Sequence, residues 1–189
     1  MPLSSKHPKI LVHLNGDLFF ALKTGFDKQT VMCYIGKKDE VVFMLKGIPK
    51  ILSPELLKVL CEMGHGDTLC IADGNFPTSA MGDDSIIIRM DGHGIPEILE
   101  AILEVCPLDN YVEKPVLLMK LLDRDVGRVE TPIWDTYTEI VEKNDDRGEA
   151  AIEHVERFAF YDETRKCHCI IATGESAIYA NIIIQKGIV

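Results

Sequence analysis

The sequence predicts a single α/β domain whose mixed, largely covered β-sheet is flanked by helices, with an extension at the N-terminus. Segments with helical spacing of apolar residues alternate with short strand-like segments. Several of the strand-like segments are apolar throughout, which is typical of strands covered on both faces. Hydrophobic residues make up 47% of the 189 residues, which is enough for the core of one domain.

Residues 1–43 differ in composition from the rest of the chain. They contain six lysines and four acidic residues, whereas the whole chain has a formal net charge of −10. Asn15-Gly16 separates the apolar runs 10–14 and 18–22, and Asn-Gly is a preferred two-residue hairpin turn. Further short strands are expected over 30–34 and 40–45. We therefore predict an N-terminal extension of uncertain order over 1–43, with a β-hairpin, and a main domain over 44–189.

The first helix of the main domain is expected to begin at Pro54. Ser53 is a suitable N-cap, and proline fits the first helical position. Gly64 is a suitable stop. The apolar stripe between them consists of Leu56, Leu57, Leu60 and Met63. The apolar run 68–72 then predicts a strand covered on both faces, and 85–90 predicts another.

The remainder of the domain continues the alternation. Pro96 opens a second helix, whose predicted inner face consists of Ile95, Ile98, Leu99 and Ile102. A strand follows over 116–122. A third helix is expected to start at Thr131-Pro132 and to bury Ile133, Trp134, Tyr137, Ile140 and Val141. Helix is expected again from Glu149 to about Thr164, and strands over 169–172 and 182–184 are expected to end the chain.

Charge and hydropathy exclude several partners and compartments. The acidic balance argues against nucleic acid and anionic membranes. No apolar run approaches the roughly 20 residues of a membrane-spanning helix, and the N-terminus lacks the features of a secretory signal. Four of the six cysteines lie in or beside apolar segments, as reduced thiols do in a cytoplasmic protein. We therefore predict a cytoplasmic protein.

The sequence contains no motif for a cofactor. Dinucleotide and phosphate-loop glycine patterns are absent, and so is the Gly-x-Ser-x-Gly nucleophile motif. Cys167-His168-Cys169 suggests a metal site, but no second pair of ligands stands nearby in the sequence. If this stretch is a strand, Cys167 and Cys169 share one face and His168 points the other way. We predict no cofactor and no metal.

His65 is the strongest candidate for proton transfer. It lies between two glycines in Met63-Gly64-His65-Gly66-Asp67, at the boundary between a predicted helix and a predicted strand. Such a boundary exposes a side chain, and the unperturbed imidazole titrates near neutrality. A structural histidine is the alternative, with about equal weight.

Further polar candidates end the strand-like segments. Asp73 follows the run 68–72, where it either binds a ligand or turns the chain. Tyr179 and Asn181 would share one face of an extended segment and offer a phenol and a carboxamide, which suits a sugar. Tyr161 follows an aromatic run and is either a core residue or a pocket residue. A straight chain would separate His65 from Asp73 by roughly 25 Å, so one shared pocket requires a fold-back near Gly66 or a neighbouring subunit.

From about residue 44 onward the chain resembles the L-fucose mutarotase family, which also contains D-ribose pyranase. The matching segments occur in order and cover nearly the whole domain. They are Leu52–Leu57, Met63–Asp67, Ala72-Asp73, Asn75–Pro77, Ile88–Gly92, Pro107–Tyr111, Glu156–Tyr161, Thr173–Glu175 and Tyr179–Asn181. The resemblance implies the family's α/β fold, no cofactor and a ring-like homo-oligomer of decamer size, with pockets at subunit boundaries.

The resemblance also implies an isomerase, an aldose anomer epimerase that interconverts the α and β anomers of the monosaccharide L-fucose by acid/base ring opening and reclosure. The family's acid/base histidine falls on His65, and its substrate-binding aspartate falls on Asp73. Its other catalytic or substrate-binding groups fall on Asp109, Tyr161, Tyr179 and Asn181, with Tyr161 as the expected partner of His65 in proton transfer. Two alternatives remain. Ala180 replaces the glycine usual in fucose mutarotases and favours a D-ribose pyranase, and a non-catalytic sugar-binding oligomer is the third interpretation.

Overall fold

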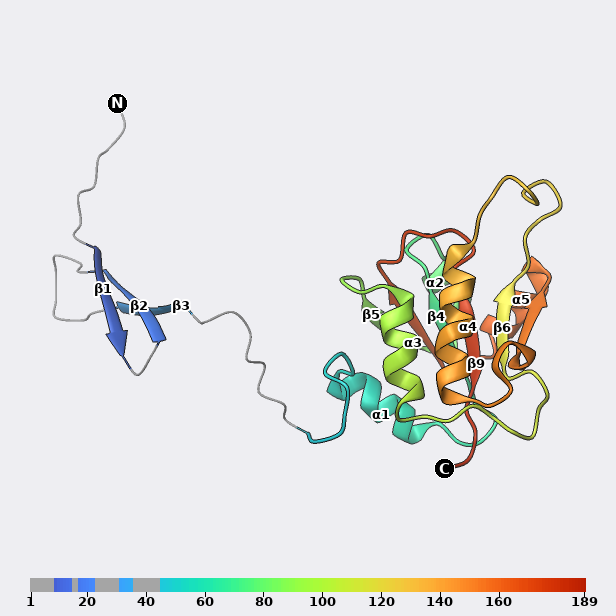
Figure 1. Ribbon diagram of the computed structural model, residues 1–189, viewed down its shortest axis with the longest axis horizontal. Helices are drawn as coiled ribbons and strands as arrows, with labels where there is room; N and C mark the ends of the chain where they lie inside the picture. The colour runs from blue at the N-terminus through green and yellow to red at the C-terminus, as the bar shows by residue number, and fades with distance from the viewer. Residues whose placement is uncertain (1–8, 15–16, 23–30, 36–44) are drawn as a thin grey trace. The chain divides into compact units, whose positions relative to one another are not determined.

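The structure, a computed structural model, describes residues 9–14, 17–22, 31–35 and 45–189 (Figure 1). The chain divides into two compact units, Met1–Lys46 and Gly47–Val189. In the first unit, β1 (Lys9–Leu14), β2 (Asp17–Leu22) and β3 (Val31–Ile35) form an antiparallel sheet in that order. Leu14 pairs with Asp17, so that two residues connect β1 to β2. The strand expected over 40–45 falls almost entirely outside the described residues.

The second unit contains a six-stranded sheet in the order β5-β8-β4-β9-β6-β7. Its strands are β4 (Thr68–Ala72), β5 (Ile86–Met90), β6 (Val116–Met119), β7 (Ile152–Val155), β8 (Cys169–Thr173) and β9 (Ile182–Gln185). Its helices are α1 (Pro54–Glu62), α2 (Thr78–Met81), α3 (Ile95–Leu103), α4 (Pro132–Asn144), the 3₁₀ helix η1 (Gly148–Ala151) and α5 (Arg157–Thr164).

Strand β9 makes the sheet mixed, as the sequence predicted. It runs antiparallel to both of its neighbours, β4 and β6, whereas the other neighbouring strands run parallel. Thr68 pairs with Gln185 at one end of the β4–β9 pair, and Ile71 pairs with Ile182 at the other end. Residues that flank β9 therefore reach both ends of β4, and this register positions the candidate site.

The larger part of the core lies between the sheet and α1, α3 and α4 (Figure 1). The predicted inner face of α3 is fully buried, since Ile95, Ile98, Leu99 and Ile102 are all at 0% exposure. Helix α1 begins as predicted, because the Ser53 hydroxyl accepts a hydrogen bond from the Leu56 N–H at 3.1 Å. A smaller apolar cluster on the other face of the sheet centres on Phe160 of α5.

The helix expected from Glu149 to about Thr164 is wrong in its first half. Residues Ile152–Val155 form β7, which pairs parallel with β6 at the edge of the sheet. The backbone groups of this segment gain sheet partners there, and tertiary pairing outweighs the local preference for helix. A new helix, α5, starts after Glu156, whose carboxylate accepts hydrogen bonds from the Phe158 and Ala159 N–H groups. The strand expected over 116–122 ends at Met119.

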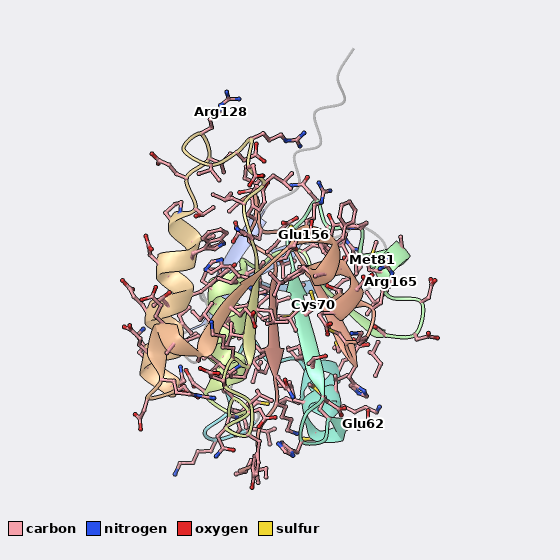
Figure 2. All side chains as sticks on the ribbon, turned by 90° about the vertical axis from the view of Figure 1, so that its right-hand side faces the viewer. Glu62, Cys70, Met81, Arg128, Glu156 and Arg165 are labelled. Atoms are coloured by element: carbon pink, nitrogen blue, oxygen red, sulfur yellow. The ribbon has the colours of Figure 1, made fainter. Side chains whose placement is uncertain are left out.

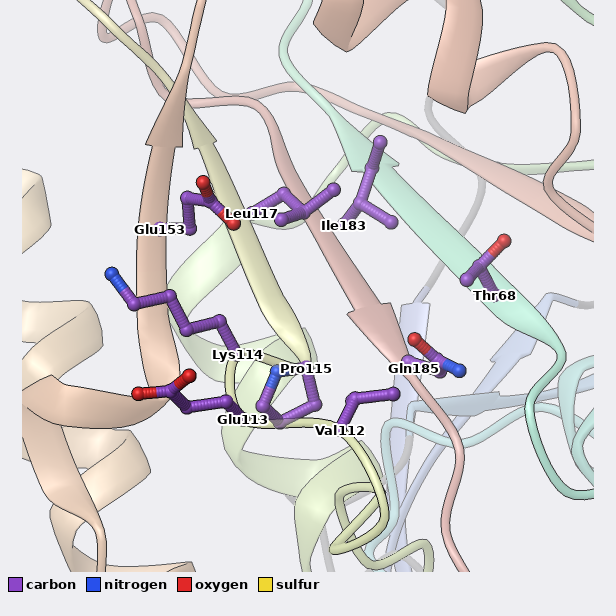
Figure 3. A pocket seen from close by; sticks show the side chains of 9 residues that line it. All are labelled: Thr68, Val112, Glu113, Lys114, Pro115, Leu117, Glu153, Ile183 and Gln185. Atoms are coloured by element: carbon purple, nitrogen blue, oxygen red, sulfur yellow. The ribbon is translucent and has the colours of Figure 1, made fainter.

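Part of the second sheet face is open. Side chains of β4, β6 and β9 line a groove there, together with the loop before β6 (Figure 3). Thr68, Leu117, Ile183 and Gln185 form its floor, and its volume is about 490 Å³. This face of the sheet is therefore only partly covered. Within the described residues, no helix is both long and apolar enough to span a membrane.

Candidate functional site

The predicted site residues form two groups at opposite ends of the β4–β9 pair. Asp73, Tyr161, Tyr179 and Asn181 line one pocket beyond the C-terminal end of β4. His65 and Asp109 lie at its N-terminal end, next to Gln185 of β9. In Figure 2, Glu62 of α1 lies near the lower end of the domain, and Glu156, which precedes α5, lies well above it. The five residues of β4 alone span roughly 13 Å, so the chain does not fold back at Gly66 to join the groups.

The first group forms what we call the Asp73 pocket, with a volume of about 250 Å³. This is below the roughly 300–1,000 Å³ typical of sites for drug-sized ligands, and it suits a small molecule. Its wall combines hydrogen-bonding groups with apolar and aromatic surface. The lining residues are Asp73, Asn75, Phe76, Pro77, Met119, Arg157, Tyr161, Ile178, Tyr179 and Asn181.

Asp73 and Asn181 hold each other in this pocket. The Asp73 N–H donates to the Asn181 amide oxygen at 2.8 Å, and the Asn181 amide nitrogen donates to the Asp73 carboxylate at 2.7 Å. The Asn75 N–H donates to the same carboxylate at 2.9 Å. Burial raises the pKa of Asp73 above its ordinary value, although these hydrogen bonds partly offset the effect. Both polar atoms of the Asn181 side chain are thus hydrogen-bonded to Asp73. The Asp73 carboxylate can still accept hydrogen bonds from a ligand in the pocket.

Tyr161 enters the pocket from α5 beside Arg157, which the sequence analysis missed. The Arg157 Nε–H donates to the Tyr161 hydroxyl oxygen at 2.9 Å, and the guanidinium carbon lies 5.4 Å from the centre of the phenol ring. Phe76 packs edge-on against the same ring, with centroids 5.7 Å apart. Because Arg157 donates to the oxygen, the Tyr161 hydroxyl hydrogen is free for a ligand. The signal available in the sequence was the i, i+4 spacing of the two residues on one helix.

Tyr179 is held in an unusual backbone conformation. Its φ is 59°, and within the described part of the chain no other non-glycine residue has a positive φ. For an aromatic residue this conformation costs about 1–3 kcal/mol, and it persists only where the surroundings impose it. The Tyr179 hydroxyl donates to the Asp125 carboxylate at 2.6 Å. Tyr179 therefore offers the pocket its ring, while its hydroxyl is tied to the loop between β6 and α4.

The second group, the His65 cluster, consists of His65, Asp109, Tyr111 and Gln185. His65 Nε2 lies 3.1 Å from Asp109 Oδ1, and the imidazole packs at 5.0 Å against the Tyr111 ring. The Gln185 amide nitrogen donates to the other Asp109 oxygen at 3.2 Å. An ionised carboxylate only accepts hydrogen bonds, so Nε2 carries the hydrogen in this contact. Nδ1 is then the nitrogen available for proton exchange, on a side chain that is 42% exposed.

The bend that carries His65 is built by its flanking residues. Gly66 adopts a φ of +87°, a conformation that favours glycine. The Asp67 carboxylate accepts a hydrogen bond from the Gly64 N–H at 2.7 Å. Lys186, which follows β9, donates from Nζ to the carbonyls of Leu60 and Met63 at 2.7 and 2.6 Å, at the end of α1. The backbone that carries the imidazole is therefore held in place by these hydrogen bonds.

Asp109 is buried, yet its pKa is lowered. Burial by itself raises the pKa of this carboxyl, but the hydrogen bonds from the Tyr111 N–H and from His65, with the charges of His65 and Arg147, outweigh it. Arg147 also donates to the Asp109 carbonyl at 2.8 Å and forms an ion pair with Asp145 at 2.7 Å. The structure thus places Asp109 as the partner of His65, away from Asp73.

The geometry changes the interpretation of the Cys167-His168-Cys169 stretch. Cys169 belongs to the larger apolar cluster and Cys167 to the smaller one on the other side of the sheet, so the two do not share one face as they would if the whole stretch were a strand. Cys167 precedes β8 in a turn, where its N–H bonds to the Thr164 carbonyl, and strand alternation does not extend to it. Within 45–189 and the strands before it, no three potential ligands group as a metal site would require.

Exposed apolar side chains flank both groups. Phe158 and Ile178, at the Asp73 pocket, are 70% and 52% exposed, and Tyr111, in the His65 cluster, is 74% exposed. Large apolar side chains at such positions mark surfaces that contact another molecule. Neither group alone combines a titratable imidazole with a hydroxyl-binding pocket.

Comparison with known proteins adds independent evidence. Residues 46–189 match the model of the RbsD / FucU transport protein family. The fucose mutarotase of Danio rerio is 47% identical over 148 residues, which are 77% of this chain and 95% of the relative. Two solved structures align with a similar share of the chain. FucU from Bifidobacterium longum has 60% identity and a TM-score of 0.74, with 76% of this chain and 99% of that chain covered. The fucose mutarotase from Streptococcus pneumoniae in complex with L-fucose has 42% identity and a TM-score of 0.71, with 77% and 99% covered.

Proposed function

Because the chain belongs to the RbsD / FucU transport protein family, we propose that it is an isomerase that interconverts the α and β anomers of L-fucose. Relatives named fucose mutarotase, at 47% identity in Danio rerio and 45% in Homo sapiens, support this activity. So does the likeness to a mutarotase structure with L-fucose bound. The observation that carries the proposal within this molecule is the Asp73 pocket, where a fixed carboxylate and a phenol face a space of monosaccharide size.

The reaction requires two proton transfers at the sugar ring. The anomeric hydroxyl loses its proton while the ring oxygen gains one, and the C1–O5 bond breaks to give the open aldehyde. Rotation about C1–C2 presents the other face of the carbonyl, and the reverse transfers close the ring as the other anomer. Two positioned acid/base groups suffice, and each contributes about 10²–10⁴-fold. We assign the removal of the anomeric proton to His65, whose Nδ1 can accept it, and the protonation of the ring oxygen to the Tyr161 hydroxyl, whose hydrogen is free.

The remaining groups bind and orient the sugar. Asp73 accepts hydrogen bonds from ring hydroxyls, and Asn181 keeps its carboxylate in place. The Tyr179 ring provides an apolar surface. Arg157, which bonds to Tyr161, adds a cationic donor beside the reacting carbon. Asp109 fixes the tautomer of His65 and acts through it. The sugar contact that the family resemblance implies for Asp109 stays a prediction.

The active site in this proposal is shared between two copies of the chain. His65 of one copy completes the Asp73 pocket of another, because β4 separates the two groups within one copy. The exposed Phe158, Ile178 and Tyr111 at the two groups are apolar surfaces that such contacts would bury. The protein is accordingly a homo-oligomer, and the decamer implied by the family resemblance fits this arrangement.

Mixed oligomers test the shared site. At L-fucose concentrations well below saturation, we expect His65→Ala and Asp73→Asn each to have low activity alone, and to regain activity when the two variants are co-expressed. A random mixture places an intact His65 opposite an intact Asp73 at roughly a quarter of the sites. Saturation-transfer NMR on L-fucose measures the exchange between the anomers. Inactive mixed oligomers, verified by mass to contain both chains, would mean that both groups act from the same copy.

The same assay separates the alternative activities. Ala180 favours a D-ribose pyranase, so exchange rates with L-fucose and D-ribose are compared at equal enzyme concentration. We expect faster exchange with L-fucose. Faster exchange with D-ribose would indicate a pyranose–furanose isomerase, and binding without exchange would indicate a sugar-binding oligomer.

We also assign the protein to the cytoplasm, since the five cysteines within 45–189 are all free and four of them are buried.

A further inference from the structure

We propose that Trp134 and Tyr137 of α4 are positioning residues that hold the segment Tyr179–Asn181 in the conformation required for sugar binding. This inference rests on the proposed function, because it concerns the same pocket. Neither residue lines the Asp73 pocket. Both act from behind it, through the backbone of the segment.

Two consecutive carbonyl groups receive hydrogen bonds from α4. The Trp134 indole N–H donates to the Tyr179 carbonyl at 2.8 Å, and the Tyr137 hydroxyl donates to the Ala180 carbonyl at 2.7 Å. Residues three apart on a helix lie on one face, so a single rigid element makes both contacts. We call this pair of bonds the α4 clamp.

The segment needs external support, since its own residues do not favour its conformation. Tyr179 has the positive φ noted above, which an aromatic residue adopts only under constraint. Asn181 must at the same time present its amide oxygen to the Asp73 N–H and its amide nitrogen to the Asp73 carboxylate. The clamped carbonyls belong to the two residues immediately before Asn181, so a change in their orientation would move the amide away from Asp73.

The hydroxyl of Tyr137 is the part of the clamp that packing does not explain. Its ring is fully buried in the larger apolar cluster, where a phenylalanine would fill the same space. Burial raises the pKa of the Tyr137 phenol well above its ordinary value, and the charges of Glu175 and Asp73 act in the same direction. The hydroxyl therefore keeps its hydrogen and can donate it at neutral pH.

The variant Tyr137→Phe removes this hydrogen bond and retains the ring. We expect the KM for L-fucose to rise about tenfold, which corresponds to about 1.4 kcal/mol, while kcat changes less than about threefold because His65 and Tyr161 are untouched. Asn144→Ala is the matched control. Asn144 lies on the same helix and donates from its side chain to the Ile140 carbonyl at 2.8 Å, away from the pocket. The control should leave KM unchanged.

Trp134 provides a second readout, because it is the single tryptophan of the chain. Its indole is bonded to a pocket residue, so L-fucose should change the intrinsic fluorescence of the wild type, and Tyr137→Phe should shift the midpoint of that titration about tenfold. A wild-type KM in Tyr137→Phe, or an equal rise in Asn144→Ala, would overturn the clamp alone. If the wild-type protein neither binds L-fucose nor exchanges its anomers, the proposed function is overturned. The role of the α4 clamp in sugar binding then falls as well.

Discussion

Asp73 and Asp109 expose nearly the same small fraction of their surfaces, 6% and 2%, yet their pKa values shift in opposite directions. Asp73 receives hydrogen bonds from an amide side chain and from backbone N–H groups, all neutral, and burial dominates. Far less protein surrounds the Asp109 carboxyl, so burial costs less there, and the hydrogen bonds from the Tyr111 N–H and His65, together with the charges of His65 and Arg147, outweigh it. The comparison teaches that equal solvent exposure does not give equal pKa shifts, because the amount of protein around a carboxyl and the partners it has together decide which form is stable.

The difference matches a division of labour between the two ends of the domain. A carboxylate without a cationic partner retains the capacity to bind a ligand, whereas one that is committed to an imidazole orients that imidazole. The Asp73 pocket is therefore expected to govern sugar affinity, and the His65 cluster is expected to govern the rate of proton transfer. The following experiments test this division, beginning with the largest expected effect.

Replacing His65 by alanine should lower the rate of anomer exchange by about 10²–10⁴-fold, because one of the two proton-transfer groups is removed. Affinity for L-fucose should change little, since the hydrogen bonds of the Asp73 pocket remain. Saturation-transfer NMR gives the rate, and calorimetric titration gives the affinity. Exchange at the wild-type rate in His65→Ala would remove this residue from the mechanism.

Asp73→Asn should act mainly on affinity. The substitution keeps the size of the side chain and removes its charge, and hydrogen bonds to charged groups contribute about 1.5–3 kcal/mol. We expect the dissociation constant for L-fucose to rise about 10- to 150-fold. Asp91→Asn is the control, because Asp91 is exposed and pairs with Arg89. The division of labour fails if Asp73→Asn lowers the exchange rate of bound sugar as strongly as His65→Ala does.

Asp109→Asn should affect stability in a way that depends on pH. Because the pKa of Asp109 is lowered on folding, its carboxylate stabilises the folded state above its unfolded pKa of about 3.9, and this contribution is lost as the pH falls through the lower folded pKa. We expect a loss of about 1–3 kcal/mol in the free energy of unfolding at neutral pH. The loss should shrink toward roughly pH 3.5. Urea unfolding at fixed protein concentration measures both, and a loss of equal size at both pH values would contradict the ionic role of Asp109.

The smallest effect concerns the pH dependence of affinity. The raised pKa of Asp73 means that its carboxylate is protonated at a higher pH than an ordinary aspartate. Affinity for L-fucose should therefore fall in proportion to the fraction of Asp73 that is ionised. We expect a decline of about a few-fold as the pH drops through that raised value. Calorimetric titration at a series of pH values measures this decline. Asp73→Asn should show no such decline, and a parallel decline in that variant would assign the titration to another group.

The fold was predictable where local signals agree with tertiary packing. The Ser53-Pro54 start of α1 and the inner face of α3 follow from capping and helical periodicity, and both are confirmed. Strand β7 was not predictable, because its four residues carry no clear alternation and are strand only through pairing with β6.

The candidate site was predictable in its residue types and less so in its connections. The proton-transfer and hydroxyl-binding residues could be named from motifs and family resemblance, and their roles remain predictions. That Asn181 is bonded to Asp73, 108 residues away, is a product of the sheet register and leaves no local pattern in the sequence. Arg157 was missed for a related reason, because its importance lies in a contact with Tyr161 and not in a motif.

Strand β9 also constrains how this protein can evolve. Three of its four residues separate Asn181, which serves one group, from Gln185, which ends the strand and serves the other. Inserting or deleting one residue in β9 would turn every later side chain to the opposite face of the sheet. Point mutations can thus adjust sugar preference one contact at a time, whereas selection should purge any change in the length of this strand.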